Sequence, residues 1–382
     1  MIRPKILVCV DWFFPGYKAG GPIQSCRNFV AAMEDDFEIF ILSSDRDLGD
    51  QKPYDSIRPG EWNNYSRLAK VYYAPVPEIN AAFLEKLVKE IKPDFIYLNS
   101  MYSFWFTILP LWLLFRKKLS AKLVLAPRGM LQAGAMLFKP AKKKLFIRLI
   151  KIAGLEKSIL FHATDDQEKK DIQQYFPKTQ VPVVASNFPA AENTVFLPVT
   201  KQPNDLKLAY ISRLAEKKNI HFFLDLLAKM PKTIQCELNL RGEFEDETYR
   251  LKCEAIIKGL PANITVKLGG AINNDHITTF LQQYHIFVLP TLGENFGHAI
   301  FEALSAGRPV LISDKTPWRN LVSQKAGWDI ALDQPEQFRR VLVAVAAMDE
   351  NDLNEWCKGA WQLADNFRKN SNIKQQYKQL FY

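Results

Sequence analysis

The sequence predicts an α/β protein made of two domains, each with a parallel β-sheet covered by helices. First, 382 residues are enough for about two domains at roughly 150 residues each. Second, short apolar runs alternate with segments of helical spacing, and near-continuous apolar runs are typical of parallel strands buried on both faces. Third, residues 187–205 carry three prolines and little periodicity, which indicates a linker between the two domains.

The first domain, residues 1–186, begins with a strand-like run. A helix is expected after Gly20 and Gly21, and another over 81–92, where apolar residues recur at helical spacing. The apolar segment 104–115 is too short to cross a bilayer, so it is expected as a buried helix, with a membrane-contacting surface as the alternative. The expected strands are 5–10, 37–43, 94–100, 122–127, 159–164 and 181–186.

The second domain, residues 206–364, repeats the alternation of strands and helices. Its expected strands are 206–214, 236–242, 264–270, 286–291 and 309–313, and its expected helices are 221–230, 247–259, 275–284 and 298–307. The chain ends in amphipathic helices from about residue 350. Residues 365–382 are expected to form a helix that packs back on the first domain.

Composition limits the classes of function and location. Lys and Arg number 50 and Asp and Glu 41, a net charge of +9, which suits anionic partners and equally a soluble surface with surplus lysine. Basic motifs interleaved with aromatic residues are not evident, so no nucleic-acid partner is expected. The five cysteines form no C-x-x-C pair, and the N-terminus resembles a strand rather than a secretory signal. We therefore expect a cytoplasmic protein.

Two loops that follow strands carry residues suited to phosphate. Ligands of open α/β sheets bind beyond the carboxyl ends of the strands. Gly20 and Gly21 precede a helix, where small residues let the backbone approach a ligand and the helix start offers unpaired amides; the alternative is an ordinary turn. In "ISRLAEKKN", Arg213 and Lys218 follow the first strand of the second domain, and both side chains bind phosphate oxygens well. Alone, this loop reads equally as a solvated charged segment.

The stretch "GENFGHAIFEAL" places two glutamates, Glu294 and Glu302, on either side of a helix start. The free amides and partial positive charge of a helix start favour a diphosphate. Carboxylates beside it would repel that anion unless they face hydroxyl groups, from which a carboxylate accepts hydrogen bonds. A nucleotide sugar has phosphates in its middle and a sugar at each end. The alternative is structural: Glu302 is a first-turn glutamate that interacts favourably with the helix dipole, and Glu294 is an ordinary carboxylate of the loop.

In this order, the glycine loop, "SRLAEKKN" and "LPTLGENFGHAIFEALSAGRPVLISDKTPW" resemble the family 4 glycosyltransferases of GT-B fold. The resemblance covers nearly the full length and is strongest to transferases of O-antigen, capsule or exopolysaccharide synthesis. It implies two Rossmann-like domains facing across a cleft. It also implies a hexosyltransferase that retains the anomeric configuration and needs no metal or other cofactor, the nucleoside-diphosphate sugar being a substrate.

The resemblance implies a role for each matching residue. Arg213 and Lys218 match the pair that holds the donor diphosphate and stabilises the leaving group. Glu294 matches the glutamate facing the donor sugar, and Glu302 the one that binds the ribose. The other donor-binding matches are Gly20 and Gly21, near the phosphates and acceptor, and Asn295, Phe296 and Gly297, whose amides contact sugar and phosphate.

Several residues depart from the family pattern or compete with it. Many members have His-Gly where this chain has Arg128 and Gly129, so Arg128 is assigned to the donor site as a charge-binding residue. For His298, contact with the sugar and packing within the fold are both open. His162 is interpreted as structural or cleft-lining. Asp45-x-Asp47 resembles a metal-chelating pattern, but short matches arise by chance, and no metal is expected.

The segment 137–154 mixes lysine and arginine with apolar residues. On a helix it suits an anionic lipid surface, and equally a packed amphipathic helix with a basic solvent face. The first reading fits peripheral association with the inner face of the cytoplasmic membrane and a lipid-diphosphate-linked glycan acceptor. Two rival functions are a nucleotide-sugar epimerase of the same shape, and a silent nucleotide-sugar-binding subunit of a polysaccharide assembly complex.

Overall fold

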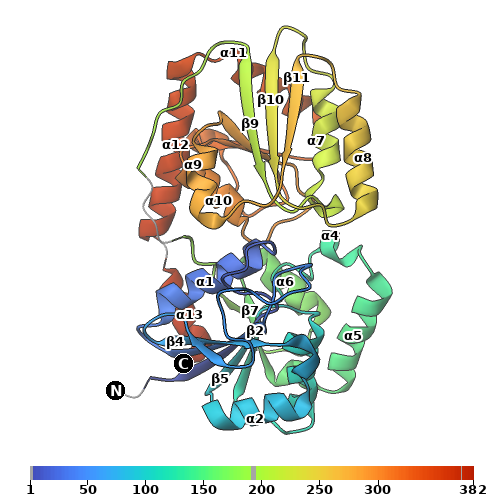
Figure 1. Cartoon of the computed structure of the whole chain (residues 1–382), viewed down its shortest axis with the longest axis vertical. Coiled ribbons are helices and arrows are strands. Elements are labelled where there is room, and N and C mark those ends of the chain that lie inside the picture. The colour runs from blue at the N-terminus through green and yellow to red at the C-terminus, as the bar shows by residue number, and fades with distance from the viewer. Residues whose placement is uncertain (1–2, 191–194, 371) are drawn as a thin grey trace. The chain divides into compact units, whose positions relative to one another are not determined.

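A computed structural model of the chain describes residues 3–190, 195–370 and 372–382. The chain divides into two compact units: unit 1 comprises Met1–Phe188 with Asn372–Tyr382, and unit 2 comprises Pro189–Ser371 (Figure 1). Part of the predicted linker, residues 191–194, lies outside the described residues.

Unit 1 contains an eight-stranded sheet in the order β3-β4-β2-β1-β5-β6-β7-β8 among the described residues. All its neighbouring strands are parallel except β3, which is antiparallel to β4. The predicted parallel α/β class is confirmed here. The strands are β1 (Lys5–Cys9), β2 (Glu38–Ser44), β3 (Trp62–Asn64), β4 (Ala69–Ala74), β5 (Phe95–Leu98), β6 (Lys122–Leu125), β7 (Ile159–Ala163) and β8 (Val183–Val184).

Helices cover this sheet, and the last of them comes from the C-terminus of the chain. Ring contacts hold it in place: Phe381 lies 6.0 Å from Phe29 and 5.5 Å from Phe37 between ring centroids. Figure 1 shows it beside α1. The helices are α1 (Gly21–Met33), α2 (Ala81–Ile91), α3 (Leu109–Phe115), α4 (Ala133–Met136), α5 (Pro140–Ile152), α6 (Asp166–Tyr175) and α13 (Ile373–Phe381).

The segment predicted as one buried helix over 104–115 is only partly buried. It begins as a π-helix, Phe104–Ile108, and continues as α3. Phe106 and Leu111 are buried, whereas Trp112 is 47% and Phe115 53% exposed. The prediction of full burial is wrong because one face alone of this short helix reaches the core.

Unit 2 contains a six-stranded parallel sheet in the order β11-β10-β9-β12-β13-β14. The strands are β9 (Asp205–Ile211), β10 (Gln235–Arg241), β11 (Ile264–Gly269), β12 (Ile286–Leu289), β13 (Val310–Ser313) and β14 (Gly327–Ile330). The helices are α7 (Ile220–Leu227), α8 (Glu247–Lys258), α9 (Ile277–Leu281), α10 (His298–Ser305), α11 (Pro335–Ala347) and α12 (Glu350–Asn370).

Within the described ranges, no helix combines the length and the apolar character that crossing a membrane requires.

Candidate functional site

The residues that the sequence singles out in unit 2 lie in the loops that follow β9 and β12 and in helix α10. β9 and β12 are neighbouring parallel strands, so the loops that follow them meet. The link is made by backbone atoms of Lys217, whose carbonyl accepts from the Leu292 amide at 2.8 Å and from the Thr291 hydroxyl at 3.3 Å. The short 3₁₀ helix Glu216–Lys218 is thereby fixed beside the loop that enters α10.

Lys218 and Glu294 form an ion pair at this junction. The Lys218 Nζ lies 2.5 Å from Oε1 of Glu294, and the two side chains are 16% and 12% exposed. The amide of Glu294 donates to the Lys315 carbonyl at 2.9 Å, which fixes the glutamate backbone. An ammonium and a carboxylate with this little exposure interact more strongly than an exposed surface pair.

Arg213 lies after β9 and is only loosely held. Its guanidinium is 3.7 Å from the Glu245 carboxylate, and the two side chains are 41% and 53% exposed. Such an exposed pair contributes little, so an incoming anion can recruit the arginine. Next to it, Gly242 has φ +145°, and a Cβ there would lie 1.9 Å from the Ser212 carbonyl oxygen. Only glycine allows this approach of the two loops.

The start of α10 offers amides that no side chain caps. Gly297 is the N-cap, with φ 77°, and no side-chain hydrogen bond caps the helix. The turn is fixed from behind: Phe296 is 4% exposed, and its carbonyl accepts from Trp318 Nε1 at 2.6 Å. The Phe296 ring therefore packs in the core and holds the turn in place. A helix start of this kind attracts anions.

Glu302 lies on α10, one turn beyond that start. Burial raises the pKa of its carboxyl to about 7 because the surroundings disfavour the charged form. Among the described residues, its carboxyl makes no hydrogen bond or ion pair. A desolvated carboxyl without a partner is suited to receive hydroxyl groups of a ligand. His298 is half-buried, with its ring centroid 4.8 Å from that of Phe296, and both interpretations of it stay open.

The candidates in unit 1 lie in two places. Gly20 is exposed and precedes α1 with φ 65°, and no side chain caps that helix. Arg128 has φ 55° and points inward. Its Nη2 donates to the Tyr97 hydroxyl and to Asn99 Oδ1, both at 2.7 Å, and its Nη1 to Asn187. To bind an anionic ligand, the Arg128 guanidinium would have to give up hydrogen bonds that it already makes to side chains of unit 1.

His162 belongs to the same network. It is fully buried, with Nδ1 2.7 Å from the Tyr97 hydroxyl and Nε2 2.7 Å from the Ala185 carbonyl. Burial and then the Arg128 charge lower its pKa to about 3, so the imidazole is neutral near pH 7. These contacts agree with the structural interpretation of His162.

The carboxylates of Asp45 and Asp47 already interact with other groups of the protein. Asp47 accepts from the amides of Tyr17 and Leu48 at 2.7 and 2.8 Å, and Asp45 pairs with Arg46 at 2.7 Å. No group of three or more His, Cys, Asp or Glu side chains able to hold a metal occurs in the part of the chain that the structure describes.

The family model of "Glycosyl transferases group 1" matches residues 193–355. This match spans most of unit 2 and less than half of the chain. A curated relative, an uncharacterized glycosyltransferase of Methanocaldococcus jannaschii named MJ1607, is 24% identical over 112 residues, which span 29% of this chain and 28% of that relative.

Solved glycosyltransferase structures match both units of this chain. A sucrose-phosphate synthase of Thermosynechococcus elongatus has a TM-score of 0.70 at 16% identity, covering 100% of this chain and 98% of its own. The lipopolysaccharide glycosyltransferase WaaG has 0.64 at 15%, covering 98% of both chains. Anabaena Alr3699/HepE, in complex with UDP-glucose, has 0.70 at 16%, covering 98% and 99%. The predicted GT-B fold is confirmed. The narrower likeness to surface-polysaccharide enzymes is loosely supported, because a sucrose-phosphate synthase also matches.

The structure adds residues to this site that the sequence did not single out by role. Lys315 holds the backbone of Glu294, Trp318 holds that of Phe296, and Gly242 makes room for the loop of Arg213. Lys315 and Trp318 lie at the end of the motif, in "DKTPW". Their position directly after a predicted strand, and close in sequence to the two glutamates, was the signal that could have identified Lys315 and Trp318.

Proposed function

We propose that this protein is a retaining glycosyltransferase that works without a metal. It would move a sugar from a nucleoside-diphosphate sugar to a hydroxyl of a lipid-linked glycan in cell-surface polysaccharide synthesis. The observation that carries the proposal is the Lys218–Glu294 pair beside the uncapped start of α10. It lies in a unit that matches the group 1 glycosyl transferases.

In the proposed reaction, the bond from the anomeric carbon to the diphosphate breaks and the acceptor oxygen bonds to the same face. The acceptor proton ends on the released diphosphate. Negative charge grows on that leaving group, and Lys218, Arg213 and the first amides of α10 stabilise it, which is the task a metal performs elsewhere. Glu294 contacts the transferred sugar. Glu302 accepts hydrogen bonds from the ribose hydroxyls.

Ligands of two similar proteins support the donor class. HepE was solved in complex with UDP-glucose, and with UDP and glucose. A TarM variant of S. aureus was solved with UDP and alpha-GlcNAc-glycerol; its TM-score is 0.57 and it covers 79% of this chain. We therefore propose a uridine diphosphate sugar as the first donor to test.

A melting-temperature panel of UDP-, GDP- and ADP-sugars tests this proposal. A donor at one hundred times its Kd is expected to stabilise the fold by about 2.7 kcal/mol, which raises Tm by several degrees. No shift with any of the three classes would contradict the donor site. Incubation of the donor alone, followed by analysis for an epimer, identifies an epimerase. Donor binding without transfer to any acceptor identifies a silent subunit.

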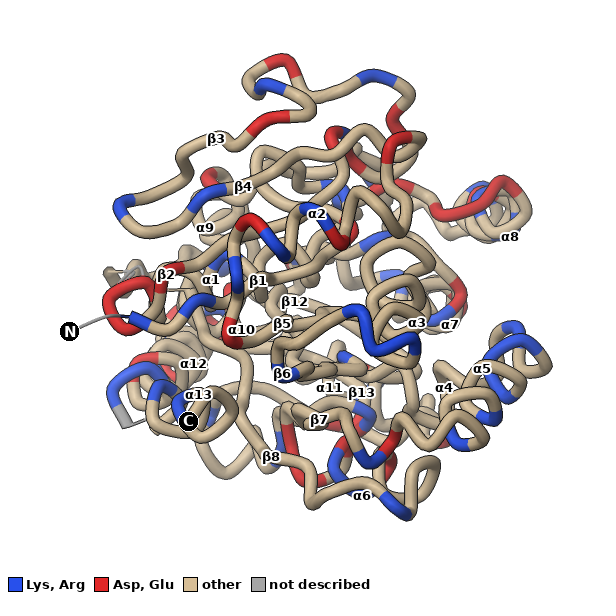
Figure 2. The backbone as a smooth tube through the Cα atoms, turned by 90° about the horizontal axis from the view of Figure 1, so that it is seen from below, with Lys and Arg blue, Asp and Glu red and all other residues tan. Residues whose placement is uncertain are grey.

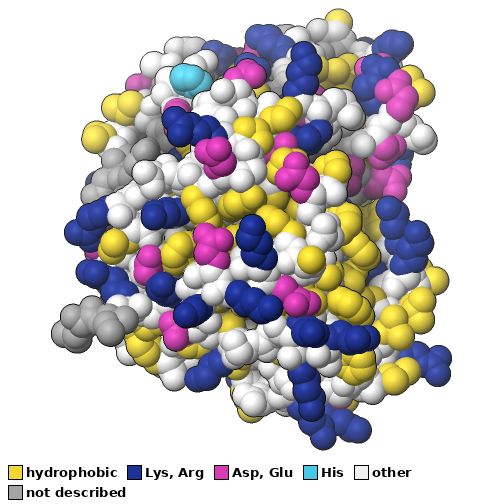
Figure 3. All heavy atoms as spheres, turned by 60° about the horizontal axis from the view of Figure 1, so that its bottom comes forward, with side chains coloured by type: hydrophobic (Ala, Val, Ile, Leu, Met, Phe, Trp, Pro, Cys, Tyr) yellow, Lys and Arg dark blue, Asp and Glu magenta, His cyan; other side chains and the backbone are white. Residues whose placement is uncertain are grey.

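The proposed lipid-linked acceptor is supported by a basic and apolar surface on unit 1. The sequence of α5 has no Asp or Glu, and Figure 2 shows Lys and Arg along it. Leu145, Leu149 and Ile152 on this helix are 58%, 54% and 72% exposed. A groove of about 400 Å³ is lined by Lys144, Ile147, Arg148, Lys151, Ile152 and Tyr175. Figure 3 shows hydrophobic side chains interleaved with Lys and Arg on the face it views.

Exposed apolar groups next to cations suit the surface of an anionic bilayer. The triple variant Lys142→Gln, Lys144→Gln, Arg148→Gln is expected to weaken binding to anionic vesicles by about 100-fold, at about 1 kcal/mol for each charge. The matched control, Lys169→Gln, Lys170→Gln, Lys178→Gln, removes the same charge from and just after α6. Co-sedimentation measures both. Equal losses of vesicle binding in the two triple variants would refute the proposal that α5 binds an anionic membrane. No preference of the unchanged protein for anionic over neutral vesicles at low salt would also refute it.

A further inference from the structure

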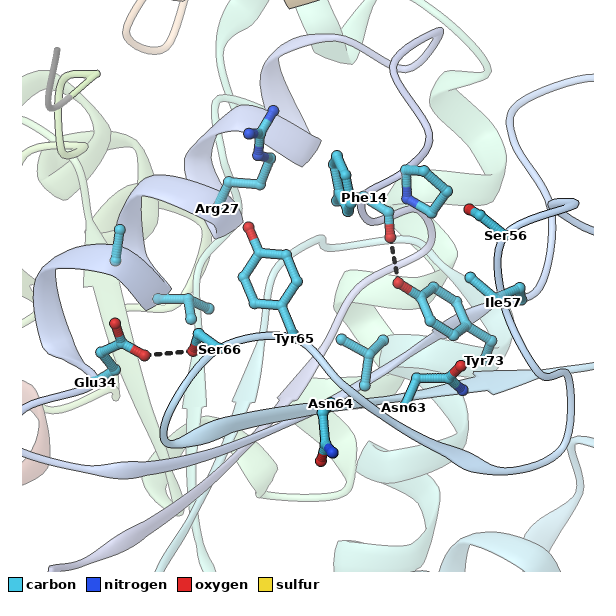
Figure 4. Close-up of a pocket in the computed structure, with 14 residues that line it drawn as sticks. Phe14, Arg27, Glu34, Ser56, Ile57, Asn63, Asn64, Tyr65, Ser66 and Tyr73 are labelled. Carbon is cyan, nitrogen blue, oxygen red and sulfur yellow. Dashed lines mark hydrogen bonds between the residues drawn. The ribbon is translucent and has the colours of Figure 1, made fainter.

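A cavity of about 470 Å³ opens in unit 1, and none of the residues assigned above lines it. Figure 4 shows its walls: the loop after β1, one face of α1, and the chain from residue 56 through β3 to β4. Its volume lies within the range of roughly 300–1,000 Å³ that small-molecule sites occupy. Val30 and Val71, both fully buried, help line it.

One wall of the cavity is aromatic. The Phe14 ring is 43% exposed and lies 5.9 Å from the Tyr65 ring, tilted by 58°. Tyr65 also packs edge-on against Phe13 at 4.9 Å. Tyr73 donates a hydrogen bond to the Phe14 carbonyl, which fixes the backbone of this wall (Figure 4). The apolar C–H face of a sugar ring packs on such exposed rings.

Beside this wall lies a cation without an acidic partner. The Arg27 guanidinium carbon is 5.0 Å from the Phe14 ring centroid, and Figure 4 shows the Tyr65 hydroxyl directed toward the Arg27 side chain. Among the described residues, neither the guanidinium nor that hydroxyl makes a hydrogen bond or ion pair. Arg27 is half-buried. A guanidinium offers a fork of donors that fits a carboxylate or a phosphate.

The other wall offers acceptors for hydroxyl groups. Glu34, the C-cap of α1, is seven residues from Arg27 and accepts a hydrogen bond from the Ser66 hydroxyl. Asn63 stabilises the loop before β3, because its Oδ1 accepts a hydrogen bond from the Arg58 amide at 2.9 Å. The cavity therefore has a cation beside two aromatic rings, and a carboxylate on the side of Arg27 away from Phe14 (Figure 4). Sugar hydroxyls can bond to the remaining lone pairs of that carboxylate.

We propose that this cavity binds a sugar unit that carries an anionic group, either a carboxylate or a phosphate ester. The anion binds Arg27 and the Tyr65 hydroxyl, the ring lies on Phe14 and Tyr65, and ring hydroxyls reach Glu34. The proposal rests on the proposed function, because it makes the sugar part of the acceptor glycan. Arg27 on α1 is seven residues from Gly20, the N-cap of that helix, which is about 10 Å at roughly 1.5 Å per residue. One glycan of a few units can thus reach both.

Calorimetry on the full chain with three probes tests the cavity. Methyl glucuronide carries a carboxylate, glucose 6-phosphate a phosphate ester, and methyl glucoside no charge. At least one acidic probe is expected to bind about tenfold or more tighter than methyl glucoside, since hydrogen bonds between charged groups are about twice as strong as neutral ones. The tighter of the two acids identifies the anion. Equal binding of all three, or none, would overturn the proposal.

Two variants and one matched control locate the binding. Arg27→Gln is expected to remove the tenfold preference, and Tyr65→Phe, which keeps the ring, to reduce it a few-fold. Arg116→Gln is the control, because that guanidinium lies 5.6 Å from the Trp112 ring on unit 1 but lines no part of the cavity; it should bind like the unchanged protein. A preference kept in both Arg27→Gln and Tyr65→Phe would overturn the assignment.

UDP binding on the same samples separates this proposal from the proposed function. Intact UDP binding in Arg27→Gln shows that the variant is folded and that a lost preference belongs to the cavity. If the unchanged protein binds methyl glucuronide but neither UDP nor any nucleotide sugar, the cavity proposal stands and the donor proposal fails. If it transfers sugar but shows no preference for acidic probes, the donor proposal stands and the cavity proposal fails.

Discussion

Lys218→Ala and Glu294→Ala are each expected to reduce sugar transfer by about 10²–10³-fold, the loss typical of removing one group that stabilises transition-state charge. Lys218 is assigned to the leaving diphosphate, so its loss should weaken binding of UDP itself. Glu294 is assigned to the transferred sugar, so its loss should weaken UDP-sugar binding and leave UDP binding nearly unchanged. Steady-state kinetics measures turnover, and calorimetry measures the binding of UDP and of the UDP-sugar.

The ion pair between these residues has a simpler explanation, that it only holds two loops together. Either single variant would then leave a poorly solvated charge alone, and the double variant Lys218→Ala/Glu294→Ala would relieve that cost. A structural pair therefore predicts that the double variant recovers activity. The proposed roles predict that it stays inactive while its melting temperature recovers. These opposite outcomes separate a catalytic pair from a structural one.

A matched pair elsewhere in unit 2 serves as the control. Lys325 and Glu355 also lie 2.5 Å apart, but their side chains are 56% and 65% exposed. Exposed pairs of this kind contribute little. Alanine at Lys325 or at Glu355 should leave turnover near that of the unchanged protein. A comparable loss of turnover in these controls would mean that the assay reports general damage to unit 2.

Most strands of the two units could be predicted, because buried parallel strands are continuous apolar runs. β1 and β9 were expected nearly where they occur. The pair β3 and β4 was missed, since β3 has three residues and the exposed Lys70 interrupts the apolar run of β4. The exposed side of α3 was also missed, because composition shows that Trp112 and Phe115 are apolar but not that the core ends beneath them.

The site residues could be predicted from motifs, but their contacts could not. Lys218 and Glu294 are 76 positions apart, and they meet because β9 and β12 are neighbours in the sheet. Strand order is not a property of any local pattern. The same holds for Arg128, which bonds to Asn187 59 positions away. Only the assembled sheet shows that its guanidinium faces inward.

Glu302→Gln is expected to make unit 2 more stable and its donor site weaker. Burial holds the pKa of Glu302 at about 7, above the ordinary value of 4.5, so folding favours the protonated form. The penalty for the charged carboxyl is absent below the ordinary value, grows as pH rises toward 7 and is complete above it. Glutamine removes that penalty. At pH 8 the variant should gain about 1–3 kcal/mol at 1.36 kcal/mol per pKa unit, and near pH 4.5 almost nothing.

Calorimetric melting of the full chain at pH 5 and pH 8 measures this gain in stability. The unfolding transition of unit 2 is identified as the one whose midpoint rises when UDP is added. A gain of 1 kcal/mol corresponds to about 2–4 °C for a unit of this size. The control Glu355→Gln, on an exposed carboxylate paired with Lys325, should show no such gain. A Glu302→Gln variant that is less stable at pH 8 would mean that the carboxyl has a stabilising partner, and the assignment of an unpaired group would be wrong.

The same desolvation that disfavours the charged form of Glu302 strengthens its hydrogen bonds to a ligand. Glu302→Gln should weaken UDP binding about tenfold, in line with roughly 1.5–3 kcal/mol for hydrogen bonds to a charged group. In the unchanged protein, UDP binding should weaken as pH falls through about 7, and in the variant this step should disappear. A UDP analogue without ribose hydroxyls should bind both proteins equally. If the analogue also discriminates between them, Glu302 acts on another part of the donor.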